Sequence, residues 1–393
     1  MILLIDDSII SSIVEFNLSE EQILIRNSAR EFAKAELLPG VIERDELQNF
    51  PDNLVKKMGD LGFMGIMVDP EFGGSGMDTL SYVLIIEELS KIDASASVIA
   101  SVNNSLVCYG IEKFGNKKQK NKYLPKLSTG ESVGAFCLSE PEAGSDATSQ
   151  TTLAVDKGDH YIINGTKNWI TNGSRAQIYI VIAQTNKSKG HKGINAFIVE
   201  RNTPGFHIGP KENKLGIRGS DTHTLQFNNV KVPKENRIGE DGFGFKFAMK
   251  TLSGGRIGIA AQALGIASGA YELALKYSKE RKAFGKEISK HQAIGFKLAE
   301  MATDIEAARL LVYKSASKKD RGESYGYSSS MAKLYASDMA MKHTVEAVQI
   351  HGGNGFVKDY HVERMMRDAK VTQIYEGTSE IQKIVISREL LKD

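Results

Sequence analysis

The hydrophobic pattern of the last third of the chain predicts long helices. Leu298, Met301, Ile305 and Ala308 recur three or four positions apart, which places them on one face of a helix. All eight prolines of the chain lie at or before Pro233. Because proline breaks a helix from within, the residues beyond it can run in long uninterrupted helices. We therefore expect a helical bundle in this part of the chain.

The first 130 residues also show helical periodicity, most clearly after a run of glycines at 73–76. Tyr82, Ile86 and Leu89 form one apolar stripe at helical spacing. Asp78 or Thr79 precedes this stripe, and both residue types are good helix N-caps. The glycine run could also cradle a phosphate, but no lysine or strand signal accompanies it.

Residues 131–240 show a different pattern, in which short β-rich runs alternate with turn signals. The runs cover 178–183, 196–199 and 224–232. Asn164-Gly165 and Asn172-Gly173 are dipeptides that favour tight turns between strands. This alternation predicts a small antiparallel barrel or sandwich between two helical regions.

We therefore predict an α+β protein, mostly α, with three domains. Residues 1–130 form an N-terminal helical domain, 131–240 a middle β domain and 241–393 a C-terminal helical domain. A length of 393 residues is compatible with two to three domains. The opening residues 1–16 are apolar but interrupted by Asp6 and Asp7, too short and too polar to span a membrane, and we expect a frayed or docked segment.

Charge and cysteine content exclude several classes of function. The chain has 50 Lys and Arg against 48 Asp and Glu, a formal net charge of +2, which gives no field to hold nucleic acid or an anionic membrane. Cys108 and Cys137 form neither a disulfide framework nor a zinc-type spacing, and the eight histidines include no metal-binding pair. We predict no metal site.

The same features indicate a location. Few cysteines fit a reducing compartment. No basic residue precedes Arg26, which excludes a secretory or transit leader for the chain as given. We expect the cytoplasm, or the mitochondrial matrix for a mature eukaryotic chain.

The common nucleotide-binding fingerprints are missing. Gly242-Phe-Gly244 begins like a dinucleotide motif, but Phe247 stands where the third glycine should be, and no Walker sequence occurs. A nucleotide cofactor would therefore be held by another architecture.

Two segments of the middle region are suited to a flat ligand. Residues 134–149 read as a short strand that enters a loop of small and hydroxyl residues, where backbone can approach a ligand closely. Trp169, the one tryptophan, is followed by Ile170 and Thr171. An aromatic plane beside a hydrogen-bond donor suits a flavin ring and its N5 atom. The alternative for Trp169 is a structural side chain buried in the core.

Two segments of the C-terminal region are suited to a nucleotide. Arg281 precedes Phe284 and Gly285, and a guanidinium beside a flexible turn can bind two oxygens of a pyrophosphate at once. Gln349 is followed by a glycine turn. The alternatives are a helix that ends in solvated charges and an ordinary helix C-cap.

The segment around Glu376 is the most informative of the chain. Glu376 stands beside Gly377 and the hydroxyls of Thr378 and Ser379. Ser379 and Gln382 fit a capping box, which predicts a helix that begins there with free backbone N–H groups at its mouth. Glu376 would lie just outside it, where a carboxylate can act on a bound anionic ligand. The alternative is an ordinary solvated loop glutamate.

Taken together and in this order, these segments resemble the acyl-CoA dehydrogenase family from about residue 17 onward, and most closely its short-chain, butyryl-CoA branch. The family-like stretches are 138–146, 169–173, 255–262, 281–285, 349–353 and 374–382. The resemblance implies N-terminal helices, a middle antiparallel β-barrel and a C-terminal four-helix bundle. It also implies FAD bound between barrel and bundle at a subunit interface of a homotetramer.

The resemblance further implies roles for individual residues. The residues expected to bind FAD are Phe136, Leu138, Ser139, Ser145, Trp169, Ile170, Thr171, Arg281, Phe284, Gln292, Gln349, Gly353, Thr378 and Glu380. The residues expected near the acyl-CoA are Ser145, Ser253, Arg256 and Gly377. Ser253 departs from the family, whose members often carry an acidic residue there.

By the same resemblance, Glu376 is the catalytic base. Some branches place the base on the bundle helix just before Arg256, but here that residue is Gly255, which cannot take a proton. The implied reaction moves a proton from the carbon α to the thioester to Glu376, and a hydride from the β carbon to flavin N5. The product is a trans-2-enoyl-CoA, and the electrons pass to an electron-transfer flavoprotein. Such a site must exclude water and raise the pKa of the glutamate.

Other functions remain open. A branched short-chain or a medium-chain acyl-CoA dehydrogenase would share these motifs. An acyl-CoA oxidase would use the same base and pass electrons to oxygen, although such enzymes are usually longer. A relative that keeps FAD but protects nucleic acid would need a basic extension or face, against which the net charge of +2 argues.

Overall fold

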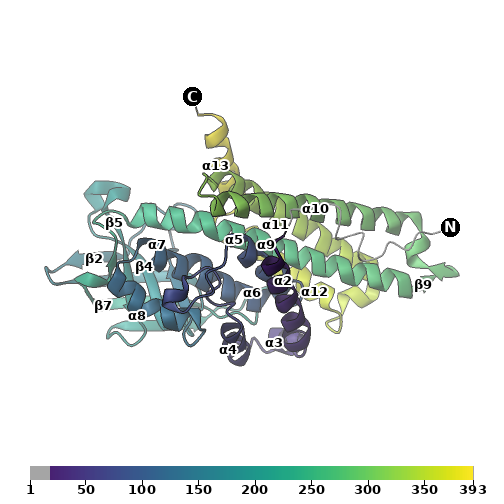
Figure 1. Ribbon diagram of the computed structural model, residues 1–393, viewed down its shortest axis with the longest axis horizontal. Coiled ribbons are helices and arrows are strands. Elements are labelled where there is room, and N and C mark those ends of the chain that lie inside the picture. Colours follow the sequence, from purple (N-terminus) through teal and green to yellow (C-terminus); the bar gives the residue numbers. More distant parts are fainter. Residues whose placement is uncertain (1–17, 393) are drawn as a thin grey trace.

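The computed structural model describes residues 18–392, and helices, strands and again helices follow one another in the predicted order (Figure 1). The expectation for residues 1–16 lies outside the described residues. The N-terminal helices are α2 (Glu20–Phe32), α3 (Val41–Glu46), α4 (Asp52–Asp60), α5 (Thr79–Ser90), α6 (Ala94–Ser101), α7 (Tyr109–Phe114) and α8 (Lys117–Ser128). A π-helical stretch, η3 (Val102–Cys108), joins α6 to α7.

Helix α5 begins where the sequence predicts. Asp78 is its N-cap, and the Asp78 carboxylate accepts a hydrogen bond from the Ser81 N–H at 2.7 Å. Every residue of α5 is buried, including those outside the apolar stripe. The helix is covered on all sides because the C-terminal bundle packs against it as well as the N-terminal helices.

The middle region is a sheet of β1 (Gly134–Cys137), β2 (Leu153–Asp156), β3 (His160–Thr171), β4 (Ile178–Gln184), β5 (Ile194–Glu200), β6 (Phe206–Lys211), β7 (Thr222–Pro233) and β8 (Arg237–Ile238). The strand order is β6-β7-β3-β2-β4-β5-β8, with β1 beside β4. Most neighbours are antiparallel; β1–β4 and β2–β4 are parallel. Three of these strands contain the β-rich runs that the sequence predicts.

One of the two predicted turns is wrong. Asn164 and Gly165 lie inside β3, where the register with β7 shifts between Ile163 and Gly165. Gly165 has φ +152°, and a side chain there would overlap Thr152. The Asn-Gly pair marks a bulge in a long strand, since a bulge requires the same backbone freedom as a turn. Asn172, with φ +62°, does begin a turn after β3.

The C-terminal region contains α9 (Gly244–Glu280), α10 (Gln292–Asp320), α11 (Gly326–His351), α12 (His361–Val371) and α13 (Ser379–Leu390), with a small hairpin of β9 (Lys282–Ala283) and β10 (Lys286–Glu287). Leu298, Met301, Ile305 and Ala308 are buried on α10, as their spacing predicts. Helix α9 is long and apolar enough to cross a membrane, but most of its apolar window is buried inside the protein, as in a core helix.

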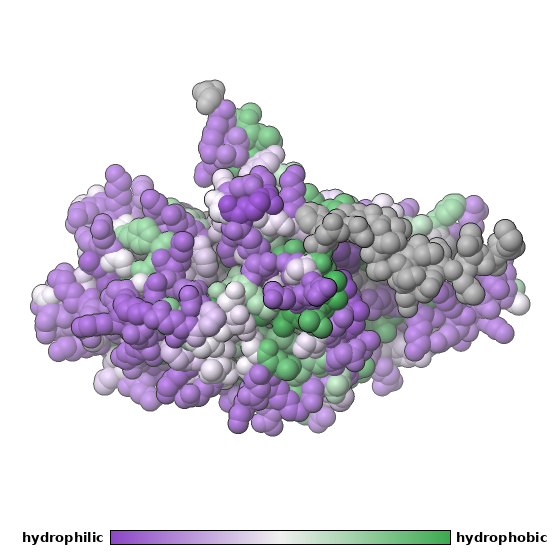
Figure 2. Space-filling model, in the orientation of Figure 1, coloured by the Kyte–Doolittle hydropathy of each residue, from purple (hydrophilic) through white to green (hydrophobic). Residues whose placement is uncertain are grey.

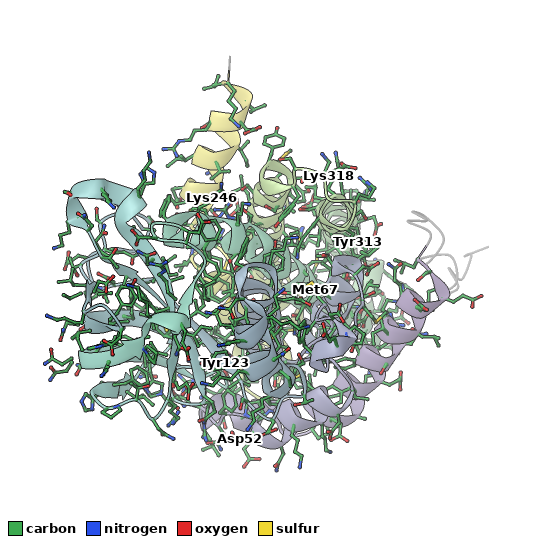
Figure 3. All side chains as sticks on the ribbon, turned by 60° about the vertical axis from the view of Figure 1, so that its left-hand side comes forward. Asp52, Met67, Tyr123, Lys246, Tyr313 and Lys318 are labelled. Carbon is green, nitrogen blue, oxygen red and sulfur yellow. The ribbon has the colours of Figure 1, made fainter. Side chains whose placement is uncertain are left out.

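Side chains from distant segments join the three regions. Tyr123 of α8 lies beside the middle sheet (Figure 3), where its hydroxyl donates to the Glu200 carboxylate of β5 at 2.9 Å. Met67 lies beside α10, and its sulfur is 3.8 Å from the Lys319 ammonium. One large hydrophobic core runs through both helical regions, and a second lies within the middle sheet.

Candidate active site

Glu376 lies in a tight turn between α12 and α13. Its φ is +54° and that of Gly377 is +92°, so two successive residues adopt the left-handed conformation. For a glutamate this conformation is strained, and the surrounding structure must hold it. The turn directs the Glu376 side chain inward, where both carboxylate oxygens are buried and have no hydrogen-bond partner among the described residues. A solvated loop glutamate, the alternative interpretation, is therefore excluded.

The environment of Glu376 shifts its proton affinity. Burial raises the pKa of Glu376 to about 8, against the opposing influence of Lys333 on α11 and Arg256 on α9. A carboxylate with a raised pKa is a stronger base than one in water. An unpaired buried carboxylate is costly to the fold, which is a common property of a group kept for chemistry.

Gly255 on α9 lies directly against this carboxylate. A Cβ at position 255 would lie 1.9 Å from Glu376 Oε2 and 2.8 Å from Leu106 Cδ2 of η3. Glycine is therefore required here, because any other residue would occupy the space of the carboxylate. The two positions at which the family places its base are thus in direct contact in this protein.

Of the predicted acyl-CoA residues, Gly377 belongs to this turn and Arg256 acts on the Glu376 carboxylate. Arg256 is buried on α9, and its Nη1 donates to the Ser330 hydroxyl at 3.2 Å, while its Nε has no partner among the described residues. Ser253 lies about one turn earlier, and its hydroxyl donates to the Met249 carbonyl at 2.9 Å. Ser145 is exposed in a loop of the middle region. A CoA contact of Ser253 stays a prediction.

The predicted cap of α13 is displaced by one residue. Thr378 is the N-cap, and its hydroxyl accepts a hydrogen bond from the Ile381 N–H at 3.4 Å. Gln382 does not complete a capping box with Ser379; its amide donates instead to the Gly377 carbonyl at 2.7 Å. Thr378 thus stands at the mouth of the helix, and Glu380 is exposed in its first turn.

Trp169 is the outstanding residue of the middle region. It has φ +62° and a 64% exposed side chain, at a point where the β3–β7 register shifts again. A buried structural tryptophan is therefore excluded. Half-buried Thr171 follows two residues later. An exposed aromatic plane next to a hydroxyl fits the face of a flavin ring.

The other predicted flavin residues of the middle region are mostly buried. Phe136 and Leu138 are buried, and the Phe136 ring packs against Phe247 of α9 at 6.3 Å between centroids. Ile170 belongs to the core of the sheet. Half-buried Ser139 accepts a backbone hydrogen bond from Asn168 at 2.9 Å, which joins the loop after β1 to β3. Phe136 and Ile170 would meet a flavin chiefly through their backbone.

A buried ion pair holds the loop after β1 against β3. The Lys167 ammonium donates to Glu140 Oε1 at 2.7 Å and to the Leu138 carbonyl at 2.9 Å. Burial alone would raise the pKa of Glu140, but Lys167 lowers it to about 2. The pair is therefore ionised, and it ties the loop that bears Leu138 and Ser139 to the strand that bears Trp169.

A second group of predicted FAD residues lies at the far end of the bundle. Arg281 and Gly353 line a cavity of about 270 Å³ together with Tyr277 and His351. Phe284 is 95% exposed at the tip of the β9–β10 hairpin. Gln292 lies at the start of α10, shortly after the hairpin, and Gln349 lies in the last turn of α11, shortly before Gly353. Both side chains are exposed.

The second group lies far along α9 from the Glu376 turn. Gly255, under Glu376, and Arg281 are 26 residues apart along α9 and its end, a distance of about 39 Å at 1.5 Å per residue. One FAD molecule does not reach that far. The residues fit FAD if the flavin end lies on one chain and the nucleotide end on another.

Comparisons with known proteins identify the family of this chain. The chain matches the models of the acyl-CoA dehydrogenase N-terminal domain over residues 19–131, the middle domain over 135–230 and the C-terminal domain over 242–391. The chain belongs to the acyl-CoA dehydrogenase family. The predicted resemblance and fold class are confirmed, and the protein is an oxidoreductase of this family.

Close relatives cover nearly the whole chain. A short-chain specific acyl-CoA dehydrogenase of Clostridium acetobutylicum is 52% identical over 379 residues, 96% of this chain and 100% of the relative. The structure of butyryl-CoA dehydrogenase from Megasphaera elsdenii has a TM-score of 0.95 and 50% identity, covering 96% and 100% of the two chains. A chain of the structure named for the electron transferring flavoprotein of Acidaminococcus fermentans and a mechanism of flavin-based electron bifurcation has a TM-score of 0.95 and 53% identity, covering 97% of this chain and 100% of that chain.

The structure adds one residue that the sequence did not reveal, Lys333, and gives Gln382 a different partner from the predicted one. Lys333 of α11 and Gln382 of α13 both donate to the Gly377 carbonyl, each at 2.7 Å. Lys333 stands in a helix among serines and alanines, where a lysine ordinarily indicates a solvated face. Only the packing of α11 against the Glu376 turn shows that it is buried.

Proposed function

We propose that this protein dehydrogenates a short straight acyl-CoA thioester, near four carbons long, with Glu376 as the base. The observation that carries this proposal is the buried Glu376 carboxylate, which has no hydrogen-bond partner among residues 18–392 and a pKa raised to about 8. The chain-length assignment is supported by the identity to short-chain and butyryl-CoA dehydrogenases over the whole chain.

The residues of the chain divide the work as follows. Glu376 takes the proton from the carbon α to the thioester, and burial makes this carboxylate basic enough for a weak carbon acid. The nearby charges of Lys333 and Arg256 favour its ionised form before the proton is taken. Gly255 leaves room for the carboxylate above α9. FAD, when bound, supplies the acceptor for the hydride that leaves the β carbon.

FAD is held by two surfaces from different chains. Trp169 and Thr171, with the loop at Leu138 and Ser139, bind the flavin, and Thr378 bounds it at the mouth of α13. Arg281, Gly353 and their neighbours bind the nucleotide portion of a FAD shared with a second chain. The length of α9 between Gly255 and Arg281 supports this division.

Exposed hydrophobic residues support assembly into a homotetramer. Helix α13 projects from the body of the molecule (Figure 1), and the projecting helix carries hydrophobic residues on one side (Figure 2). Ile384 and Leu390 are exposed there, as are Phe284 and Phe356 near the far end of the bundle. Exposed apolar residues in this number are typical of a surface that another chain covers.

We further propose the electron acceptor, the location and the domain limits. Electrons pass to an electron-transfer flavoprotein, as the resemblance to the A. fermentans chain suggests. The protein works in the cytoplasm, or in the mitochondrial matrix if the chain is a mature eukaryotic one. The domains divide at 130/131 and 240/241.

One experiment tests the substrate assignment. The purified, FAD-loaded protein is mixed anaerobically with straight acyl-CoAs of four to sixteen carbons and with branched four- and five-carbon members, and flavin reduction is followed by absorbance. We expect butyryl-CoA to reduce the flavin fastest. Faster reduction by a medium-chain or branched thioester would assign the protein to one of those branches.

A second measurement tests the acceptor. Turnover is followed with electron-transfer flavoprotein and, separately, with oxygen alone. We expect efficient turnover only with the flavoprotein; rapid stoichiometric formation of peroxide would show an acyl-CoA oxidase instead.

A further inference from the structure

Lys333 on α11 is a buried cation beside the base. Its side chain has no exposed surface, and its ammonium makes one hydrogen bond among the described residues, to the Gly377 carbonyl at 2.7 Å. Burial lowers the pKa of Lys333 to about 8, although Glu376 opposes this effect. A buried lysine with so few partners costs the fold free energy, so a role in the site would explain it.

The bond to Gly377 acts on the shape of the Glu376 turn. The Gly377 carbonyl accepts from two donors, Lys333 Nζ and the Gln382 amide, each at 2.7 Å. This carbonyl belongs to the pair of left-handed residues that directs Glu376 inward. Two donors from different helices fix the peptide plane, so the strained turn cannot relax.

The charge of Lys333 acts on Glu376 directly. Lys333 is foremost among the cations that favour the ionised carboxylate, ahead of Arg256 of α9. Besides Glu376, the charged groups that face Lys333 are Arg256 of α9, Asp338 of α11 and Glu380 of α13. Tyr82 of α5 and Tyr375 also face Glu376, and burial keeps both of these phenols neutral by raising their pKa.

We propose that Lys333 is a positioning residue for the dehydrogenation, which holds the Glu376 turn through the Gly377 carbonyl and supplies the buried positive charge that lets the carboxylate ionise. This inference rests on the role of Glu376 as the base. Gln382 shares the first task but not the second, since its amide carries no charge.

The test compares three variants of the full-length, FAD-loaded protein. Lys333→Gln removes the charge and keeps an amide donor, Lys333→Met removes both, and Gln382→Leu removes the second donor without changing a charge. Lys342→Gln, on the exposed side of the same helix, is the matched control. Flavin reduction by butyryl-CoA is measured anaerobically from pH 6 to 10, with FAD content and the melting temperature as checks of folding.

Lys333→Gln is expected to slow flavin reduction at pH 7 by about tenfold or more and to move the midpoint of the pH profile upward by about one unit, since an opposite charge at this range shifts a carboxyl pKa by one to three units. Lys333→Met should show the same shift with a larger loss of rate. Gln382→Leu should lower the rate equally at all pH values. Lys342→Gln should match the wild type.

A second readout does not depend on turnover. The melting temperatures of the wild type and Glu376→Gln are compared at pH 5 and pH 8.5, with Lys or Gln at position 333. At pH 8.5, Glu376→Gln should raise the melting temperature by more when position 333 is Gln than when it is Lys. In the Gln background the carboxylate is buried without the positive charge of Lys333.

The outcomes separate the two proposals. An unshifted pH midpoint in Lys333→Gln, or an unchanged difference in melting temperature, would overturn the role of the Lys333 charge. If Glu376→Gln itself kept rapid flavin reduction, the assignment of the base would fall, whatever Lys333 does. If neither Lys333 variant folds, Gln382→Leu still tests the proposal. A shifted pH midpoint in that variant would contradict the assignment of the charge effect to Lys333 and of only turn-holding to Gln382.

Discussion

At the scale of single residues, the chemistry depends on one carboxylate. Glu376→Gln keeps the shape of the side chain and removes its basicity. We expect flavin reduction to fall by about 10²–10⁴-fold, the usual contribution of a general base, with FAD and acyl-CoA binding retained. Glu389→Gln, exposed on the same α13, is the control. Retention of more than about a tenth of the wild-type rate would show that the proton goes elsewhere.

The same residue makes stability depend on pH in a defined direction. Folded Glu376 keeps its proton up to about pH 8, whereas in the unfolded chain it loses the proton near its ordinary pKa of about 4.3. Between these values the folded state binds more protons, so stability falls as pH rises. Glu376→Gln should therefore melt at a higher temperature than the wild type at pH 8.5 and at a similar one at pH 4.5. An equal difference in melting temperature at both pH values would contradict the raised pKa of Glu376.

Contact between positions 255 and 376 permits a transfer of the base. Gly255→Glu alone should fold poorly or lose activity, because its Cβ would overlap the Glu376 carboxylate. The double variant Gly255→Glu with Glu376→Gly removes that overlap and leaves Leu106 as a close neighbour of the new Cβ. We expect part of the activity to return with an altered chain-length preference, measured across the same thioester series. The single variant Glu376→Gly is the inactive reference.

At the scale of elements, the sequence predicts helix ends best where contacts between neighbouring residues determine them. Asp78 caps α5 because the first turn offers it a free N–H close by. The cap of α13 is ambiguous, since Thr378 and Ser379 are adjacent hydroxyl residues, and the partner of Gln382 is the Gly377 carbonyl rather than Ser379. Asn164-Gly165 requires backbone freedom in either a turn or a bulge, so local sequence could not separate the two.

Burial that depends on packing between elements could not be predicted. The sequence around Lys333 and around Lys167 does not distinguish them from solvated lysines, yet both side chains are wholly buried. Trp169 shows the reverse, because a residue type that is usually buried is exposed on β3. The motif indicates Glu376, but the burial of its carboxylate results from the packing of α9 and α11 against the turn.

The ion pair behind the flavin loop gives a prediction for that element. Lys167→Met would leave Glu140 buried and charged, which typically costs about 3–5 kcal/mol. We expect a lower melting temperature and loss of FAD on dialysis, because the loop at Leu138 is no longer tied to β3. Lys157→Met, in an exposed turn of the same region, is the control. Unchanged FAD retention would show that the loop is held by other contacts.

At the scale of the whole molecule, the proposed cofactor site is divided between two chains, a division that rests on the length of α9. The protein should purify yellow with one FAD per chain, and its mass in solution should be that of a tetramer. Colourless protein that cannot be reconstituted with FAD would contradict the cofactor assignment. A monomer that retains FAD would contradict the division of the site between chains.

Subunit complementation tests that division directly. If Arg281 of one chain completes the site of Glu376 in another, Arg281→Ala and Glu376→Gln each damage every site in their own assemblies. A pair that contains one chain of each kind has one site with both wild-type residues and one with neither. Such pairs, isolated with two different affinity tags, should regain about half of the wild-type sites, measured as rapidly reducible flavin at limiting FAD. If both residues served the same chain, each hybrid site would carry one defect, and no rapid reduction would return.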